Sequence, residues 1–160
     1  MTGNSIYTNY KSLDNIEYIC SLNFEYLYLI SNIKNKFTDI KDIKNKKIGI
    51  LNIDDSSSIK YKLVLNEITS ILYLKEGRDY TVVYADSLDK LFMDLESGSI
   101  DFIFYTGFYP NDKLNKIFLH DIKNELYIIP LKIHNSLLKS AYRYYLPTTI
   151  DLNFIRNYLP

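Results

Sequence analysis

Short apolar runs alternate with amphipathic segments along the chain, and this alternation predicts an α/β fold. Four runs have the length and the β-branched and aromatic content of buried strands: KIGILNI (47–53), YTVVYA (80–85), IDFIFY (100–105) and LYIIPL (126–131). The segments between and after them have helical periodicity, at about 59–74, 87–96, 111–120 and 134–142. Strands that alternate with helices predict a doubly wound, mainly parallel sheet with helices on both faces and right-handed crossovers.

Capping residues predict where several of these helices begin and end. Ser87 is a good N-cap for a helix with four apolar residues on one face, and Gly98 suits the left-handed position after it. The sequence SGS (97–99) is therefore interpreted as a helix stop. Gly77 follows the first long helix in the same way, and Thr38 is the expected cap of a short helix at 39–43.

The outer parts of the chain have a different character. Residues 1–15 are polar and are expected to form an N-terminal arm, whereas 16–31 has two strand-like runs around Asn23. Residues 151–160 are expected to form a C-terminal tail. The region between, 16–150, is expected to form a single domain.

Charge and cysteine content exclude some classes of function. The 19 basic and 19 acidic residues balance, so no cationic excess is available for a general nucleic-acid binder. A single cysteine, Cys20, cannot form an internal disulfide, which favours a reducing compartment. No basic region followed by an apolar run is found at the N-terminus, and the longest apolar stretch, 26–30, is too short for a membrane span. A cytoplasmic or intracellular location is therefore expected.

The residue bias is informative about the genome. Ile, Asn, Lys and Tyr are frequent and Trp is absent, which is typical of AT-rich codons. We expect an AT-rich genome, such as that of a large DNA virus or a parasite. Tyr and Asn are therefore weaker functional signals in this chain than in most.

The segment ILNIDDSSSIK contains the first candidate for a ligand site. It predicts a strand, a polar loop and a helix N-terminus, and ligands of open parallel sheets bind beyond the carboxyl ends of the strands. Ser56, Ser57 and Ser58 could bind a carboxylate or phosphate there with the free N–H groups of the helix. The alternative is that one serine caps the helix, and Asp54 with Asp55 favours this alternative because both would repel an anion.

The segment YTGFYP follows a strand at the same predicted edge of the sheet. Tyr105, Thr106, Gly107 and Tyr109 could form one wall of a site, since tyrosine combines apolar area with one directional hydrogen bond. The alternative is a core aromatic residue followed by a structural turn. The loops at 53–58 and 105–110 are expected to meet at one edge.

Catalytic and metal-binding patterns are not found. His120 and His134 have no neighbours at metal-ligand spacing, and the nucleophile, phosphate-loop and dinucleotide motifs are absent. Asp101 begins a strand on the side away from the expected site, so we expect it to cap a turn. The sequence therefore predicts neither an enzyme nor a bound cofactor.

Several segments, in order, resemble TAXI-type solute-binding proteins, the receptor subunits of TRAP transporters. The most specific is LESGSIDFIFYTGFYP (95–110), which is similar to the family pattern L-x-x-G-x-I-D-A-x-F-x-x-x-G-x-P. Weaker similarity is found at 16–31, 42–50, 126–131 and 137–150. The resemblance implies one lobe of a type II periplasmic-binding-protein fold, the second lobe with its hinge strands, over residues 16–150.

The resemblance also implies a function and a departure from it. It implies binding of a small carboxylate-bearing solute, with Asn23 among the ligand-binding candidates. The family's glycine-rich loop corresponds to 51–57, which here reads LNIDDSS, without glycines and with two carboxylates. The alternative is therefore a structural or protein-interaction module that has lost the ligand. A lone lobe exposes apolar surface, so a homo-oligomer or a protein partner is expected at 16–31 and at the aromatic loops.

Overall fold

The computed structural model of the chain describes residues 25–32, 37–52, 55–108, 111–120 and 126–129. The arm expected at 1–15, the first strand-like run before Asn23, the helix predicted at 134–142 and the tail at 151–160 lie outside the described residues.

Strands and helices alternate over the described residues, as the apolar pattern predicts. The strands are β1 (Tyr26–Asn32), β2 (Lys46–Leu51), β3 (Tyr80–Ala85), β4 (Phe102–Gly107) and β5 (Leu126–Ile128). The helices are the 3-10 helix η3 (Ile40–Ile43) and the α-helices α1 (Asp55–Ile71), α2 (Leu88–Glu96) and α3 (Asp112–His120). None of these helices is long and apolar enough to cross a bilayer.

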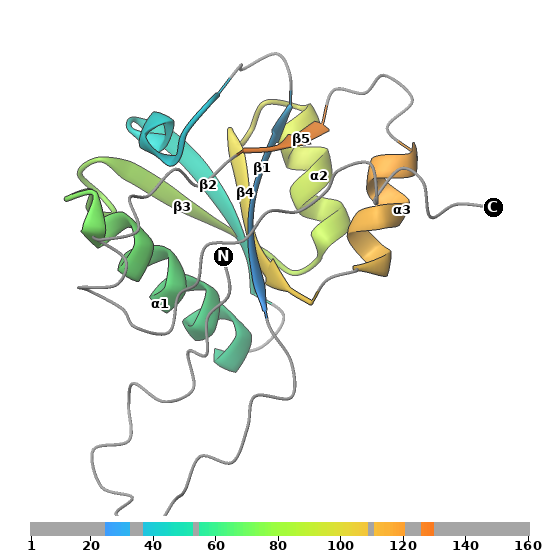
Figure 1. Cartoon of the computed structure of the whole chain (residues 1–160), viewed down its shortest axis with the longest axis horizontal. Coiled ribbons are helices and arrows are strands. Elements are labelled where there is room, and N and C mark those ends of the chain that lie inside the picture. The colour runs from blue at the N-terminus through green and yellow to red at the C-terminus, as the bar shows by residue number, and fades with distance from the viewer. Residues whose placement is uncertain (1–24, 33–36, 53–54, 109–110, 121–125, 130–160) are drawn as a thin grey trace, which may run out of the picture.

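The strands form one sheet in the order β3-β2-β4-β1-β5 (Figure 1). β2 pairs in parallel with β3 and β4, whereas β1 pairs antiparallel with both β4 and β5. The α/β class and the placement of the four predicted strands in one sheet are thus confirmed. β5 is shorter than predicted. The sheet is mixed rather than parallel, because β1 runs antiparallel to the other four strands.

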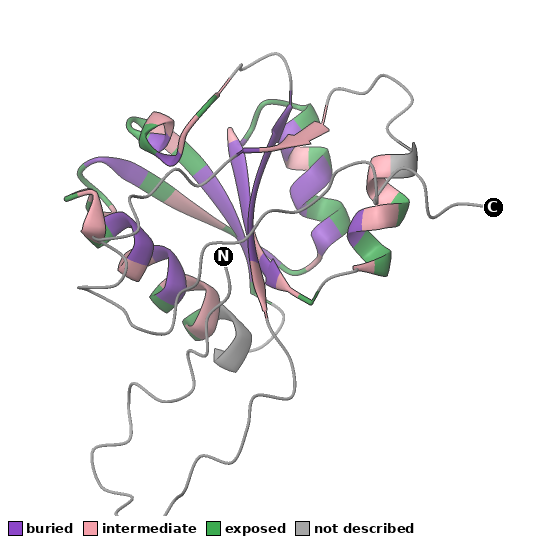
Figure 2. Cartoon of the chain, in the orientation of Figure 1, coloured by how far each residue is buried: buried purple, intermediate pink, exposed green. Residues whose placement is uncertain are grey.

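Two helical layers enclose the sheet (Figures 1 and 2). α1 and η3 pack on one face, through a cluster that includes Leu65 of α1 and Phe104 of β4. α2 and α3 cover the other face, through a cluster that includes Leu91 and Leu114. Successive side chains of a strand point to opposite faces, so β4 supplies buried residues to both clusters.

Helix α2 agrees with its sequence signals in detail. The Ser87 hydroxyl accepts a hydrogen bond from the Lys90 N–H at 3.2 Å, so Ser87 is the N-cap. The four apolar residues of the predicted face are all buried: Leu88, Leu91, Phe92 and Leu95. Gly98 has φ +76°, the left-handed conformation that glycine adopts without steric cost. The interpretation of SGS as a helix stop is confirmed.

Helix α1 differs from its predicted range at both ends. It begins at Asp55, four residues early, so the three serines at 56–58 lie in its first turn rather than in a loop. At the other end Tyr73 adopts φ +58°, and the Leu74 N–H donates to the Thr69 carbonyl at 3.0 Å. This bond is typical of a left-handed helix stop, which Tyr73 provides instead of the predicted Gly77.

The cap predicted for the short helix η3 is wrong by one residue. Asp39 is its N-cap, and the Asp42 carboxylate accepts hydrogen bonds from the N–H groups of Asp39 at 3.1 Å and Thr38 at 2.8 Å. A carboxylate inside the helix therefore satisfies the backbone donors at its start. Thr38 lies one residue before the cap.

Asp101 has a structural role, but it links two strands rather than capping a turn as predicted. Its carboxylate accepts a hydrogen bond from the Lys47 N–H at 2.9 Å, and its own N–H donates to the Lys47 carbonyl at 2.9 Å. The ammonium of Lys46 lies 3.5 Å from the same carboxylate. Asp101 thus joins the starts of β2 and β4, at the opposite edge of the sheet from the candidate site.

Candidate functional site

The carboxyl ends of β2 and β4 lie at the same edge of the sheet, as predicted. The two strands are parallel neighbours, with Ile48 opposite Phe102 and Gly49 opposite Ile103. α1 begins soon after β2, so its first turn and the end of β4 share this edge. The side chains of Ser56, Ser57 and Ser58, and the whole of Asn23 and Tyr109, lie outside the described residues.

Tyr105 is held by other groups of the protein. Its ring stacks on Tyr61 of α1, with the centroids 6.1 Å apart, and lies 6.0 Å from the ring of Tyr28 on β1. Its hydroxyl accepts a hydrogen bond from the side-chain amide of Asn111 at 3.2 Å. The ring thus joins three elements, which favours a structural role for Tyr105.

Gly107 and Asn111 complete the turn between β4 and α3. The Asn111 side-chain oxygen accepts a hydrogen bond from the Leu114 N–H at 3.0 Å, which caps α3. A Cβ atom on Gly107 would lie 2.8 Å from the Asn111 amide nitrogen and 2.8 Å from Cε1 of Tyr105. A larger residue here would therefore displace the side chains of Asn111 and Tyr105. The described part of the aromatic loop agrees with a structural turn.

We expect Asn111→Ala to lower the free energy of unfolding by about 1 kcal/mol, the usual loss for a helix N-cap. Asn111→Asp keeps the oxygen that caps α3 but cannot donate to the Tyr105 hydroxyl. It should therefore retain most of the stability that alanine loses. Urea unfolding of the three proteins measures the difference, and an aspartate variant as unstable as alanine would show that the contact with Tyr105 is the more important one.

Thr106 is the candidate residue whose polar group has no partner within the described structure. Its side chain is only 4% exposed, and its hydroxyl oxygen has no hydrogen-bond partner in the described structure. Thr106 pairs with Leu27 within the sheet, and it lies on the face of β4 that carries Phe104, which α1 covers. A buried hydroxyl without a partner is energetically unfavourable, and a ligand would reach it only by displacing the side chains that cover it.

Strand β4 extends past the point where the sequence predicts its end. Thr106 and Gly107 were expected in a loop, but both belong to β4. β1 continues along β4 as far as Tyr26, which lies opposite Gly107. Pairing with β1 therefore keeps the last two residues of β4 extended beyond the level at which β2 ends.

Sequence reasoning missed two aromatic residues at this edge, Tyr61 and Tyr28. Tyr61 contacts both buried clusters, and the Tyr28 hydroxyl donates to the Phe108 carbonyl at 3.3 Å. Near Tyr61, Lys60 forms an ion pair with Glu25, which joins α1 to the residue before β1. Nothing in the periodicity of α1 or β1 indicates that these side chains meet Tyr105.

The prediction of an association surface at 16–31 is wrong for the part of this segment that the structure describes. β1 lies between β4 and β5, and its residues 27–32 are all buried. This strand therefore contributes to the core and cannot offer a free edge to a partner.

Among the described residues, no group of His, Cys, Asp and Glu side chains could hold a metal ion.

Comparison with known proteins supports the fold. No protein-family model matches this sequence, and no curated protein is significantly similar to it. Among solved structures, a polar amino acid ABC uptake transporter substrate-binding protein from Streptococcus thermophilus matches with a TM-score of 0.50 and 15% identity, over 69% of this chain and 38% of that one. An amino acid ABC transporter substrate-binding protein from Streptococcus pneumoniae, bound to L-arginine, matches with a TM-score of 0.47 and 18% identity, over 69% and 39%.

The match to the Streptococcus thermophilus protein defines the class of fold. The mixed sheet between two helical layers is that of one lobe of a type II periplasmic-binding-protein fold. The chain spans about two fifths of the length of the two proteins described above.

Proposed function

We propose that this chain is a non-catalytic, solute-binding-protein-like domain that binds a small carboxylate-bearing solute weakly. The site is the carboxyl edge of β2 and β4, where the first turn of α1 lies near the end of β4. The observation that carries the proposal is Thr106, whose buried hydroxyl has no partner in the described structure. Binding of solutes by structural neighbours, such as L-arginine by the Streptococcus pneumoniae protein, supports this class of function.

The chemistry of the edge suits an anion. The first N–H groups of an α-helix have no partner within the helix, and the helix dipole places about half a positive charge there. A solute carboxylate could accept hydrogen bonds from these N–H groups of α1 and from the Thr106 hydroxyl. Ser56, Ser57 and Ser58 occupy the first turn of α1 and are proposed to add hydroxyl donors.

Two features make the binding weak. Asp54 and Asp55 add negative charge at the start of α1, and like charges a few ångströms apart cost about 1 kcal/mol or more near a surface. A single lobe also offers one open wall, whereas binding pockets enclose most of a ligand. A second wall would have to come from another lobe or another chain.

We expect the double variant Asp54→Gly/Asp55→Ser to bind small mono- and dicarboxylates about tenfold more tightly than the natural sequence, because tenfold corresponds to about 1.4 kcal/mol. Thr106→Val should remove this binding without loss of stability, because valine has a similar shape and the hydroxyl has no partner in the part of the chain that the structure describes. Isothermal titration calorimetry with acetate, succinate and the common amino acids measures both effects. Tight carboxylate binding by the natural sequence would contradict the role given to the two aspartates.

The second candidate function is a structural or protein-interaction module without a ligand. It is favoured by the Tyr105 hydroxyl, which is already bound by Asn111, and by the absence of glycines at 51–57. If neither the natural sequence nor the double variant binds any of the acids, this second function is the better one.

The narrower assignment to the TAXI type is also part of the proposal. It is supported by the sequence at 95–110, whose residues 95–107 form the end of α2, the turn with Gly98 and strand β4. A gene for a TRAP transporter membrane subunit beside the gene for this chain would support it. An ABC permease gene in that position would contradict it.

A further inference from the structure

Helices α2 and α3 cover the face of the sheet opposite α1 (Figure 1). Residues of both helices line a groove on this face. Its volume is about 490 Å³, which is within the usual range for small-molecule sites. Both helices follow parallel strands, so their N-terminal turns lie at the same end of the groove. Leu126, at the start of β5, lines the other end together with Glu96.

The floor of the groove is apolar. Phe92 of α2 and Ile117 of α3 face it from the two sides, and the half-buried Tyr105 of β4 lies between them. Leu51, at the end of β2, continues this surface toward the carboxyl edge. A hydrocarbon or aromatic group that covered this floor would leave water, at about 25 cal/mol for each Å² buried.

The two walls of the groove have opposite charge. Asp86, Asp89 and Glu96 line it from the side of α2, whereas Lys113 and Lys116 line it from α3. None of these five side chains has an ion pair or a hydrogen bond in the described part of the chain. By contrast, Lys90 and Asp94 of α2 pair with each other at 2.7 Å.

We propose that this groove binds a zwitterionic small molecule with an apolar body, specifically an α-amino acid with an aromatic or large aliphatic side chain. The ammonium group would lie beside Asp86 and Asp89, and the carboxylate beside Lys113 and Lys116. The side chain would cover the apolar floor. This groove lies on the face of the sheet covered by α2 and α3, whereas Thr106 lies on the face covered by α1, so the proposal does not depend on the function proposed there.

The first experiment tests the ligand class with matched probes. L-phenylalanine is titrated into the full chain by calorimetry, beside phenethylamine, which lacks the carboxylate, and 3-phenylpropionate, which lacks the amine. An ion pair with an exposed side chain is worth up to about 1 kcal/mol, or about fivefold in affinity, so both analogues should bind about fivefold more weakly than the amino acid. Equal binding of phenethylamine and phenylalanine would overturn the role of the lysines, and equal binding of 3-phenylpropionate would overturn that of the aspartates.

The second experiment tests the place of binding. Lys116→Glu and Asp89→Lys change exposed residues and should each weaken phenylalanine binding about tenfold, whereas Lys41→Glu, on η3, should have no effect. The double variant Asp89→Lys/Lys116→Asp restores one charge of each sign, on exchanged walls, and should recover part of the affinity. A loss of affinity in all three single variants would overturn the proposal.

Three other results would also overturn this proposal. The natural sequence could fail to bind phenylalanine at millimolar concentration. Thr106→Val could remove phenylalanine binding while Lys116→Glu leaves it intact, which would place the amino acid at the sheet edge and support the proposed function instead. Light scattering could show a dimer that Lys116→Glu dissociates, which would make the groove an interface between two copies.

Discussion

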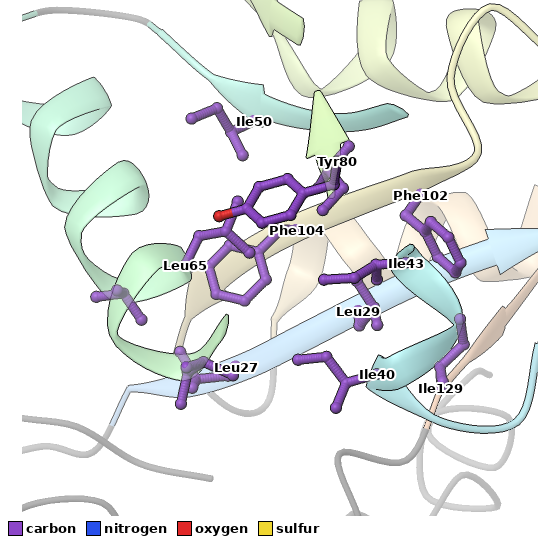
Figure 3. Close-up of a cluster of buried hydrophobic side chains, with 13 residues drawn as sticks. Leu27, Leu29, Ile40, Ile43, Ile50, Leu65, Tyr80, Phe102, Phe104 and Ile129 are labelled. Atoms are coloured by element: carbon purple, nitrogen blue, oxygen red, sulfur yellow. The ribbon is translucent and has the colours of Figure 1, made fainter. Parts of the chain in front are cut away.

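Phe104→Ala is expected to lower the free energy of unfolding by about 3–5 kcal/mol, the range measured when a buried phenylalanine is replaced by alanine. Phe104 is 0% exposed and lies in the centre of the sheet, on β4. Figure 3 shows its ring beside Leu65 of α1, within the cluster that joins the sheet to α1 and η3. Such a loss is a large part of the 5–15 kcal/mol that stabilises a typical domain.

Chemical unfolding monitored by circular dichroism measures this effect. Phe104→Leu keeps most of the buried volume and should cost less than about 1.5 kcal/mol. Phe108→Ala is the matched control, because the same substitution removes a ring that is 51% exposed. A similar loss for Phe104→Ala and Phe108→Ala would mean that the core is not centred on β4.

Gly49→Val should cost about 1–3 kcal/mol, the range for overpacking a core. Gly49 lies on β2, between β3 and β4, so the backbone is held by neighbours on both sides. A Cβ atom there would lie 2.6 Å from Cδ1 of Ile100 and 2.6 Å from Cδ2 of Leu91. Gly49→Ala adds one carbon to the same space, so its effect should be smaller and of the same sign.

A double-mutant cycle with Leu91→Ala tests whether the loss of stability in Gly49→Val comes from a steric clash with Leu91. Leu91→Ala alone leaves a cavity, but it also frees the space into which the side chain at position 49 would grow. Together with Gly49→Val it should therefore cost less than the sum of the two single effects, by about 0.5–3 kcal/mol. Additive effects would contradict a steric origin for the glycine.

Local signals predicted α2 well. Ser87 lies at the start of α2 and Gly98 just after its end, and each acts within one turn of the helix. Their roles therefore depend little on the rest of the chain. The start of α1 was missed because the prediction began at the first apolar residue, Ile59. The first turn of that helix, from Asp55, follows the end of β2 directly and precedes the apolar stripe.

The sequence predicted that the ends of β2 and β4 meet at one edge, but not the contacts of the individual side chains there. Parallel strands bring their carboxyl ends to one edge, so the meeting of α1 with the end of β4 follows from the order of the elements. The contacts that each side chain makes do not follow from the order of the elements. Tyr105 has its ring and hydroxyl engaged by Tyr61, Tyr28 and Asn111, whereas Thr106, the next residue, is buried and its hydroxyl has no partner among the described residues.

The sequence alone predicted the four parallel strands, the boundaries of α2 and the α/β class, because apolar periodicity and capping act over a few residues. Only the tertiary structure decided that β1 enters the interior of the sheet, that β4 extends to Gly107, and that oppositely charged walls flank a groove between α2 and α3. These features join residues that are far apart in the chain, such as Tyr28 and Tyr105. Contacts of this kind form only when the whole sheet assembles, since the entropy of closing such long loops is offset by the packing of every layer at once.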